Sequence, residues 1–227
     1  MVIILAGCAE QTDVKLTEPD GPSNSVKNVT SAEVEVLTPK TVTLSDFSEP
    51  SWYTDDVQIS KIRNLTDTGN VWKLQDKSPA YQQAIRSFQS GKLGGYRVDM
   101  KILRSRTLSG SVAALRISSS PEGEQKIWDL HFDSHTGNFK AGTFDGYTFG
   151  NAMESSVDET MTVSVLGLFD KGQSFTVSVI PAIGNELGDF DEFAEGELQV
   201  VDLKITELHQ SDLYSLAKTW FDSGSIE

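Results

Sequence analysis

Five polar residues alternate with apolar residues in three stretches of this 227-residue chain. They are Arg97 and Asp99 in YRVDMKI, Arg116 in AALRIS, and Asp129 and His131 in WDLHFD. Successive side chains of an extended strand point to opposite faces of its sheet. If these strands are neighbours, guanidinium, carboxylate and imidazole groups therefore line one outer face and can hydrogen-bond the hydroxyls of a sugar. The alternative is the ordinary polar outer face that every β-sandwich has.

Carbohydrate recognition also needs an aromatic platform for the C–H face of the sugar ring. Candidate platforms lie in or beside predicted loops, at Trp52, Tyr53, Tyr81, Tyr147 and Phe149. Packing in the core or at its rim is the alternative for each of them. Trp128 differs, because it shares its strand face with Leu130 and Phe132. We expect Trp128 to be a core residue.

The stretch GDFDEFAEGE places several carboxylates in one predicted loop, and hard cations such as calcium prefer oxygen ligands. The candidate calcium ligands are Asp189, Asp191 and Glu192, with Glu195 and Glu197 nearby. The stretch lacks the spacing of an EF-hand, so an ordinary solvated acidic loop is the alternative. No other cofactor is expected, because three histidines and one cysteine are too few and too scattered for a His/Cys metal site.

The chain has none of the motifs that mark a catalytic nucleophile, a zinc protease, a phosphate-binding loop or a dinucleotide site. Paired acidic residues such as Asp55-Asp56 and Asp158-Glu159 are explained as turn residues, because a glycosidase needs two carboxylates held apart across the sugar. The sequence therefore predicts a protein that is not an enzyme. Nineteen Lys and Arg against 33 Asp and Glu give a net charge of −14, which argues against a nucleic-acid partner.

The only cysteine lies in Leu5-Ala6-Gly7-Cys8, which matches the motif read by the bacterial lipoprotein signal peptidase. On this basis residues 1–7 are the remnant of a signal peptide and Cys8 carries the lipid anchor. Ala9 after the cysteine, in place of Asp, favours the outer membrane of the bacterial envelope. No Lys or Arg precedes Cys8, so we expect the true start to lie further upstream. The alternative is a cytosolic protein with an incidental cysteine.

The segment 8–41 is rich in Thr, Ser, Pro, Asn and acidic residues and poor in large apolar ones. Such a composition cannot compensate for the entropy lost on ordering, so we expect a flexible, disordered tether between anchor and domain.

Residues 42–208 show short alternating segments separated by turn residues, which predict an all-β domain. The core-facing sets are Tyr96/Val98/Met100/Ile102, Ala113/Leu115/Ile117, Trp128/Leu130/Phe132, Met161/Val163/Val165, Phe175/Val177/Val179 and Val201/Leu203/Ile205. Seven or more strands of this kind, without an interior helix, indicate an antiparallel β-sandwich of the jelly-roll type.

The tail, residues 209–227, changes to helical spacing in SDLYSLAKTWF, with Ser211 or Asp212 as the N-cap. Its apolar stripe includes Leu213, Leu216 and Trp220. Either the stripe covers a sheet edge or it docks a protein partner.

The order of three stretches resembles the carbohydrate-binding jelly-roll modules of the xylan- and glucan-binding type, including those appended to phage tail proteins. The matching features are Gly94 with Tyr96 and Val98, Phe132-Asp133 with Thr136-Gly137, and the last strand from Gly196 to Ile205. The resemblance spans about Ser51 to Leu208. It implies the sandwich fold and, by analogy, sugar binding.

These observations predict a lipid-anchored, non-catalytic protein of the bacterial cell envelope that binds a polysaccharide or oligosaccharide. An envelope assembly protein that binds another protein is the second hypothesis, and a polysaccharide-degrading enzyme is the third.

Overall fold

The computed structural model describes residues 40–55, 57–63, 70–76, 82–104, 112–119, 127–134, 139–143, 151–155, 160–184 and 196–222. Several predictions fall outside these ranges: the anchor at Cys8, the tether up to residue 39, the platforms Tyr81, Tyr147 and Phe149, and the calcium ligands Asp189, Asp191 and Glu192.

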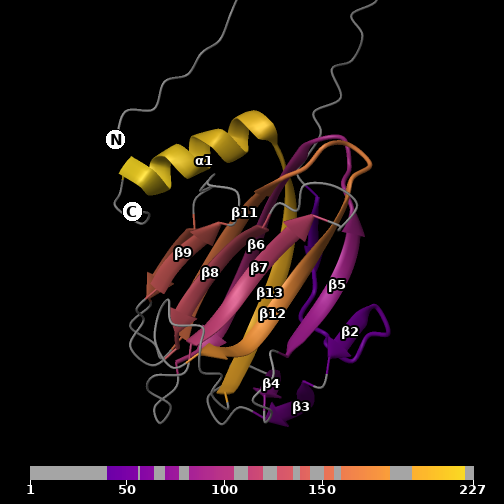
Figure 1. Ribbon diagram of the computed structural model, residues 1–227, viewed down its shortest axis with the longest axis vertical. Helices are drawn as coiled ribbons and strands as arrows, with labels where there is room; N and C mark the ends of the chain where they lie inside the picture. Colours follow the sequence, from indigo (N-terminus) through magenta and orange to yellow (C-terminus); the bar gives the residue numbers. More distant parts are fainter. Residues whose placement is uncertain are drawn as a thin grey trace, which may run out of the picture. The chain divides into compact units, whose positions relative to one another are not determined.

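Residues 38–227 form one compact unit in which the described strands make two antiparallel sheets, as the sequence predicts (Figure 1). Sheet A has the order β10 (Asn151–Ser155), β11 (Thr160–Leu168), β6 (Gly94–Leu103), β13 (Gly196–His209), β4 (Asn70–Asp76) and β3 (Gln58–Arg63), and β1 (Thr41–Thr43) also pairs with β13. Sheet B has the order β2 (Trp52–Asp55), β5 (Gln83–Gln89), β12 (Ser174–Gly184), β7 (Val112–Ser119), β8 (Ile127–Asp133) and β9 (Phe139–Thr143).

The two sheets enclose one main hydrophobic core, as expected for an aligned sandwich. Five of the six predicted core-facing sets are buried in it throughout, and Trp128 is 2% exposed at its centre. The centroid of the Phe169 ring lies 5.0 Å from that of Trp128 and 4.5 Å from that of Phe175. These contacts join β8, in sheet B, to the end of β11, in sheet A. The alternation of period two therefore determines which side of each strand is buried.

The sixth set is wrong at one residue. Val200 is fully buried while Val201 is only half-buried, and Leu203 and Ile205 again face the core. The reason is an irregularity in β13, whose register with β6 shifts between Val200 and Asp202. A β-bulge adds one residue to a strand and so reverses the side on which the following residues point.

One helix, α1 (Gln210–Asp222), follows β13 directly. The predicted caps are wrong, because Ser211 and Asp212 already lie in the first turn. Leu213 and Trp220 are buried with Leu166 of β11, against the outer face of sheet A. The hypothesis that the apolar stripe covers the protein's own sheet is therefore the one that the structure supports, and the covered surface is a face rather than an edge.

Two consecutive glycines in β6 lie where α1 packs closely against sheet A. A Cβ on Gly95 would lie 2.9 Å from the Leu208 carbonyl oxygen and 3.2 Å from a Leu213 methyl group. Gly94 has φ +74, a left-handed conformation that favours glycine. The GGY motif of the sequence thus allows the close approach of helix and strand. None of the helical residues that the structure describes forms a segment with the length and apolar content needed to cross a bilayer.

Candidate functional site

The five polar residues predicted to share one outer face lie on two faces instead. Arg97 and Asp99 are on β6 in sheet A, whereas Arg116, Asp129 and His131 are on β7 and β8 in sheet B. The chain changes sheets between β6 and β7. Alternation in a sequence shows which side of a strand is polar, but it does not show to which sheet the strand belongs.

The sheet B residues form a compact ionic cluster at the centre of the outer face. The Arg116 guanidinium donates to one Asp129 carboxylate oxygen from Nε at 2.9 Å and from Nη2 at 2.5 Å. His131 Nε2 lies 3.3 Å from the same oxygen. Asp129 is 2% exposed and His131 is 5% exposed. The structure thus joins the residues of WDLHFD to Arg116 as expected from their alternation.

Asp129 stays ionised in this cluster. Burial acts to raise the pKa of the Asp129 carboxyl, but the hydrogen bond with His131 and the charge of Arg116 outweigh it and hold that pKa below its ordinary value. Because Asp129 is almost fully buried, it acts on the face through its partner: it holds the Arg116 guanidinium, whose side chain is 18% exposed.

Tyr53 shares a cross-strand row with this cluster. The register pairs Tyr53 with Ile85, Ile85 with Ser178, Ser178 with Arg116, and Arg116 with Asp129. With strands about 4.8 Å apart, the row from β2 to β8 spans roughly 19 Å. Tyr53 is 65% exposed, the largest value among the large hydrophobic residues described. The outer face of sheet B therefore combines an open aromatic ring with charged groups further along the row.

Trp52, the neighbouring candidate platform, is a core residue. It is 6% exposed, its ring lies 4.6 Å from that of Phe47, and its Nε1 donates to the Leu44 carbonyl at 3.3 Å. Trp52 and Tyr53 are consecutive in β2, so only one of them can face outward. Of the two alternatives for Trp52, a sugar platform or packing in the core, the structure supports core packing.

Arg97 contacts helix α1, and Asp99 is the ion-pair partner of Arg97. Arg97 Nε lies 2.6 Å from Asp99 Oδ1, which also accepts from the Ser164 hydroxyl at 2.5 Å. The Arg97 guanidinium stacks over the Trp220 ring at 5.6 Å. The side chains of Arg97 and Asp99 remain 30% and 26% exposed beside the helix.

The structure shows a second polar cluster, which the sequence did not predict. Glu197 Oε2 lies 2.6 Å from Lys73 Nζ and accepts from Gln75 Nε2 at 3.0 Å, while Glu197 Oε1 accepts from Gln199 Nε2 at 2.9 Å. The signal was present as K-x-Q in β4 and E-x-Q in β13. Glu197, near the expected calcium ligands, thus pairs with lysine. No group of three metal-ligating side chains occurs among the described residues.

No protein-family model and no curated protein sequence matches the chain. Similar solved structures include the CBM22-1–GH10 modules of Clostridium thermocellum xylanase 10B complexed with xylohexaose, with a TM-score of 0.43 and 14% identity over 70% of this chain and 26% of that one. The mannan-recognising module TmCBM27 has a TM-score of 0.35 and 13% identity over 74% of this chain and 98% of that one.

A family 11 carbohydrate-binding module of Clostridium thermocellum, in complex with a β-1,3-1,4-mixed-linked tetrasaccharide, has a TM-score of 0.26 and 14% identity over 62% of this chain and 94% of that one. The match with the xylanase described above covers only about a quarter of that chain. At TM-scores below 0.5, the assignment of the fold rests on strand order and register.

Proposed function

We propose that this chain is a non-catalytic carbohydrate-binding protein and that a polysaccharide chain lies across the outer face of sheet B. The observation that carries the proposal is the row in which the open Tyr53 ring and the Arg116–Asp129 pair share one register. An aromatic ring packs against the C–H face of a sugar, and the partly exposed Arg116 guanidinium, held by Asp129, donates to sugar hydroxyls. The span of roughly 19 Å suits an extended oligosaccharide better than a single sugar.

The affinity of such a face is expected to be weak, in the micromolar to millimolar range for a short oligosaccharide. Each hydrogen bond to a sugar hydroxyl replaces one to water, so the net gain is small. Exposed Tyr53 makes no core contact, and its removal should affect binding without affecting the fold.

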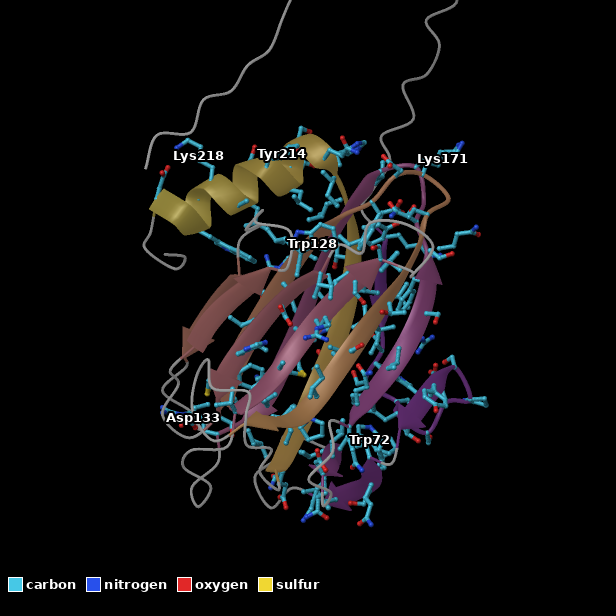
Figure 2. All side chains as sticks on the ribbon, in the orientation of Figure 1. Trp72, Trp128, Asp133, Lys171, Tyr214 and Lys218 are labelled. Atoms are coloured by element: carbon cyan, nitrogen blue, oxygen red, sulfur yellow. The ribbon has the colours of Figure 1, made fainter. Side chains whose placement is uncertain are left out.

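The test is retention of the full chain on gels that contain xylan, mannan or mixed-linkage β-glucan. Tyr53→Ala should weaken retention on the bound polysaccharide, whereas Tyr53→Phe should keep it because the ring remains. Tyr214→Ala is the matched control, since Tyr214 is also an exposed aromatic residue, at 50%, but lies on α1 (Figure 2). Equal behaviour of Tyr53→Ala and Tyr214→Ala, or no retention on any polysaccharide, would contradict the proposal.

The location follows from a separate proposal, supported only by the motif Leu5-Ala6-Gly7-Cys8. We propose that Cys8 is lipidated and that the domain is held at the bacterial cell envelope, at the outer membrane. Expressed in a bacterium behind a basic signal-peptide segment added upstream of residue 1, the chain should incorporate labelled acyl chains, and Cys8→Ser should not. Equal labelling of both would exclude the anchor.

A further inference from the structure

A second polar array lies on the outer face of sheet A, on the opposite side of the sandwich from Tyr53. Cross-strand pairing places its residues in two short rows over β3, β4 and β13. We call these residues the amide array: Gln58, Gln75 and Glu197 in one row, and Ser60, Lys73 and Gln199 in the other.

Glu197 is the fixed point of the amide array. Lys73, Gln75 and Gln199 all direct donors to its carboxylate, at 2.6, 3.0 and 2.9 Å. Burial acts to raise the pKa of the Glu197 carboxyl, but the hydrogen bonds from Lys73 and Gln199 outweigh it and hold that pKa below its ordinary value. The carboxylate therefore stays ionised and keeps the three surrounding side chains ordered before any ligand arrives.

The hydrogen bonds also fix which end of each amide is offered to a ligand. Gln75 and Gln199 use their amide nitrogens on Glu197, so each keeps its amide oxygen as an acceptor. Ordered acceptors on a flat sheet suit a ligand that carries many hydroxyl donors. Half-buried Ile62, which pairs with Val71 in the next row, adds an apolar border on the same face.

The amide array is open to solvent and lies on a part of sheet A away from helix α1. Helix α1 packs against β6, β10, β11 and β13, and in Figure 1 it lies toward the opposite end of the molecule from β3 and β4. Gln58 and Ser60 are exposed, and the side chains of Lys73 and Glu197 are 25% and 22% exposed. A ligand can reach these groups without displacing the helix.

Charge decides which hydroxyl-rich ligand fits. Lys73 and Glu197 cancel, so the amide array is neutral, whereas the whole chain carries −14. An anionic polysaccharide would be repelled by the chain and would find no uncompensated cation in the array. We propose that the amide array is a second contact surface for an uncharged polysaccharide, so that one domain contacts polysaccharide on both outer faces.

Two sites on opposite faces change retention more than affinity for a short ligand. On an insoluble or gel-bound polysaccharide, the second contact becomes intramolecular and raises retention by avidity. A soluble oligosaccharide cannot reach both faces at once, so each site then binds independently.

The test compares four versions of the full chain on gels containing xylan, mannan or mixed-linkage β-glucan: wild type, Tyr53→Ala, Gln75→Ala/Gln199→Ala, and all three substitutions together. The glutamine pair should weaken retention about tenfold or more, and should do so most clearly in the Tyr53→Ala background. Lys204→Gln is the matched control, because Lys204 pairs with Asp202 on the same outer face but outside the array. The thermal midpoint of each variant confirms folding, and Gln75→Ala alone serves if the double variant unfolds.

The outcomes separate this inference from the proposed function. If Tyr53→Ala loses all retention and the glutamine variant binds like the wild type, the amide array is not a site while the proposal for sheet B stands. If the glutamine variant alone loses retention, the array is a site and the proposal for sheet B fails. Side-chain amide NMR signals of Gln75 and Gln199 that do not move with xylohexaose or mannohexaose would also overturn the inference.

Discussion

The two sheets bury parts of their outer faces by different physical means. On sheet B, the buried groups are polar: Asp129 and His131 are buried, and the half-buried Arg116 guanidinium neutralises the Asp129 carboxylate. On sheet A, the buried group is apolar Leu166, which α1 covers with Leu213 and Trp220. A buried ion pair tolerates no loss of one partner, whereas an apolar contact weakens in proportion to the area lost. The first face should therefore respond to charge and pH, and the second to side-chain volume.

The largest expected effect is the loss of the Asp129 charge. Asp129→Asn puts a neutral amide in the buried position and leaves the half-buried Arg116 guanidinium without its anionic partner, so the free energy of unfolding should fall by about 3 kcal/mol at pH 7. Urea unfolding measures it. Arg116→Met/Asp129→Leu is the control, because replacing both partners by apolar groups should recover most of the loss. A double variant as unstable as the single one would mean that packing, not charge, dominates there.

The same residue makes a prediction about pH. The pKa of Asp129 is lowered on folding from its ordinary value of 3.8, so the folded state binds this proton less readily than the unfolded state. Its contribution to stability is therefore complete above about pH 4–5 and is lost as the pH falls through the folded pKa. The stability difference between wild type and Asp129→Asn should narrow over that range. A constant difference from pH 7 to pH 2.5 would contradict the lowered pKa.

The second effect concerns the cover on sheet A. Trp220→Ala removes the largest side chain of the small cluster with Leu166 and Leu213, together with the ring under Arg97. Because α1 can open without the sandwich unfolding, we expect the protection of α1 amides from hydrogen exchange to fall by about 2–3 kcal/mol. The amides of β7 and β12 should keep theirs. Equal loss in both regions would mean that the helix and the sandwich unfold as one unit.

A smaller effect is expected at Gly95, where α1 packs closely against β6. Gly95→Ala places a methyl group 2.9 Å from the Leu208 carbonyl and 3.2 Å from Leu213, so β13 or α1 must shift. The cost should be about 1–3 kcal/mol, as for other overpacked sites, with a changed environment of the Trp220 indole in NMR spectra. Gly172→Ala is an informative contrast, because φ +80 strains it although its Cβ would meet nothing within 4 Å. The Trp220 signal should move in the first variant only.

Much of the sandwich could be predicted from the sequence because burial follows the period of two. Sets such as Phe175, Val177 and Val179 face the core as expected. Two features lay beyond that argument. The bulge near Val201 is an extra residue whose effect depends on its partner strand, and the assignment of Arg97 and Arg116 to different sheets depends on crossovers between sheets.

The candidate site was predictable in part for the same reasons. Arg116, Asp129 and His131 were grouped correctly because their strands are consecutive in the chain and pair directly. Adding Tyr53 needed the register of β5 and β12, whose residues come from distant segments. The sequence could have limited Trp52 and Tyr53 to one platform, since consecutive strand residues face opposite sides, but not shown which of the two it is. The amide array was not predicted from the sequence, because its glutamines carry no net charge and form no recognisable motif.

The smallest effect is expected on the exposed side of α1, where Figure 2 shows Lys218 and Tyr214. Lys218 Nζ lies 2.6 Å from Asp222 Oδ2, but their side chains are 74% and 58% exposed, so water screens the pair. The lysine also precedes the acid, which is the less favourable order in a helix. In addition, Asp222 stands at the negative end of the helix dipole.

Lys218→Ala should therefore change the free energy of unfolding by less than about 0.5 kcal/mol, and Asp222→Asn should be neutral or slightly stabilising. A loss above 1 kcal/mol for Lys218→Ala would show that charge also stabilises the cover of sheet A, and the contrast between the two faces would then be one of degree.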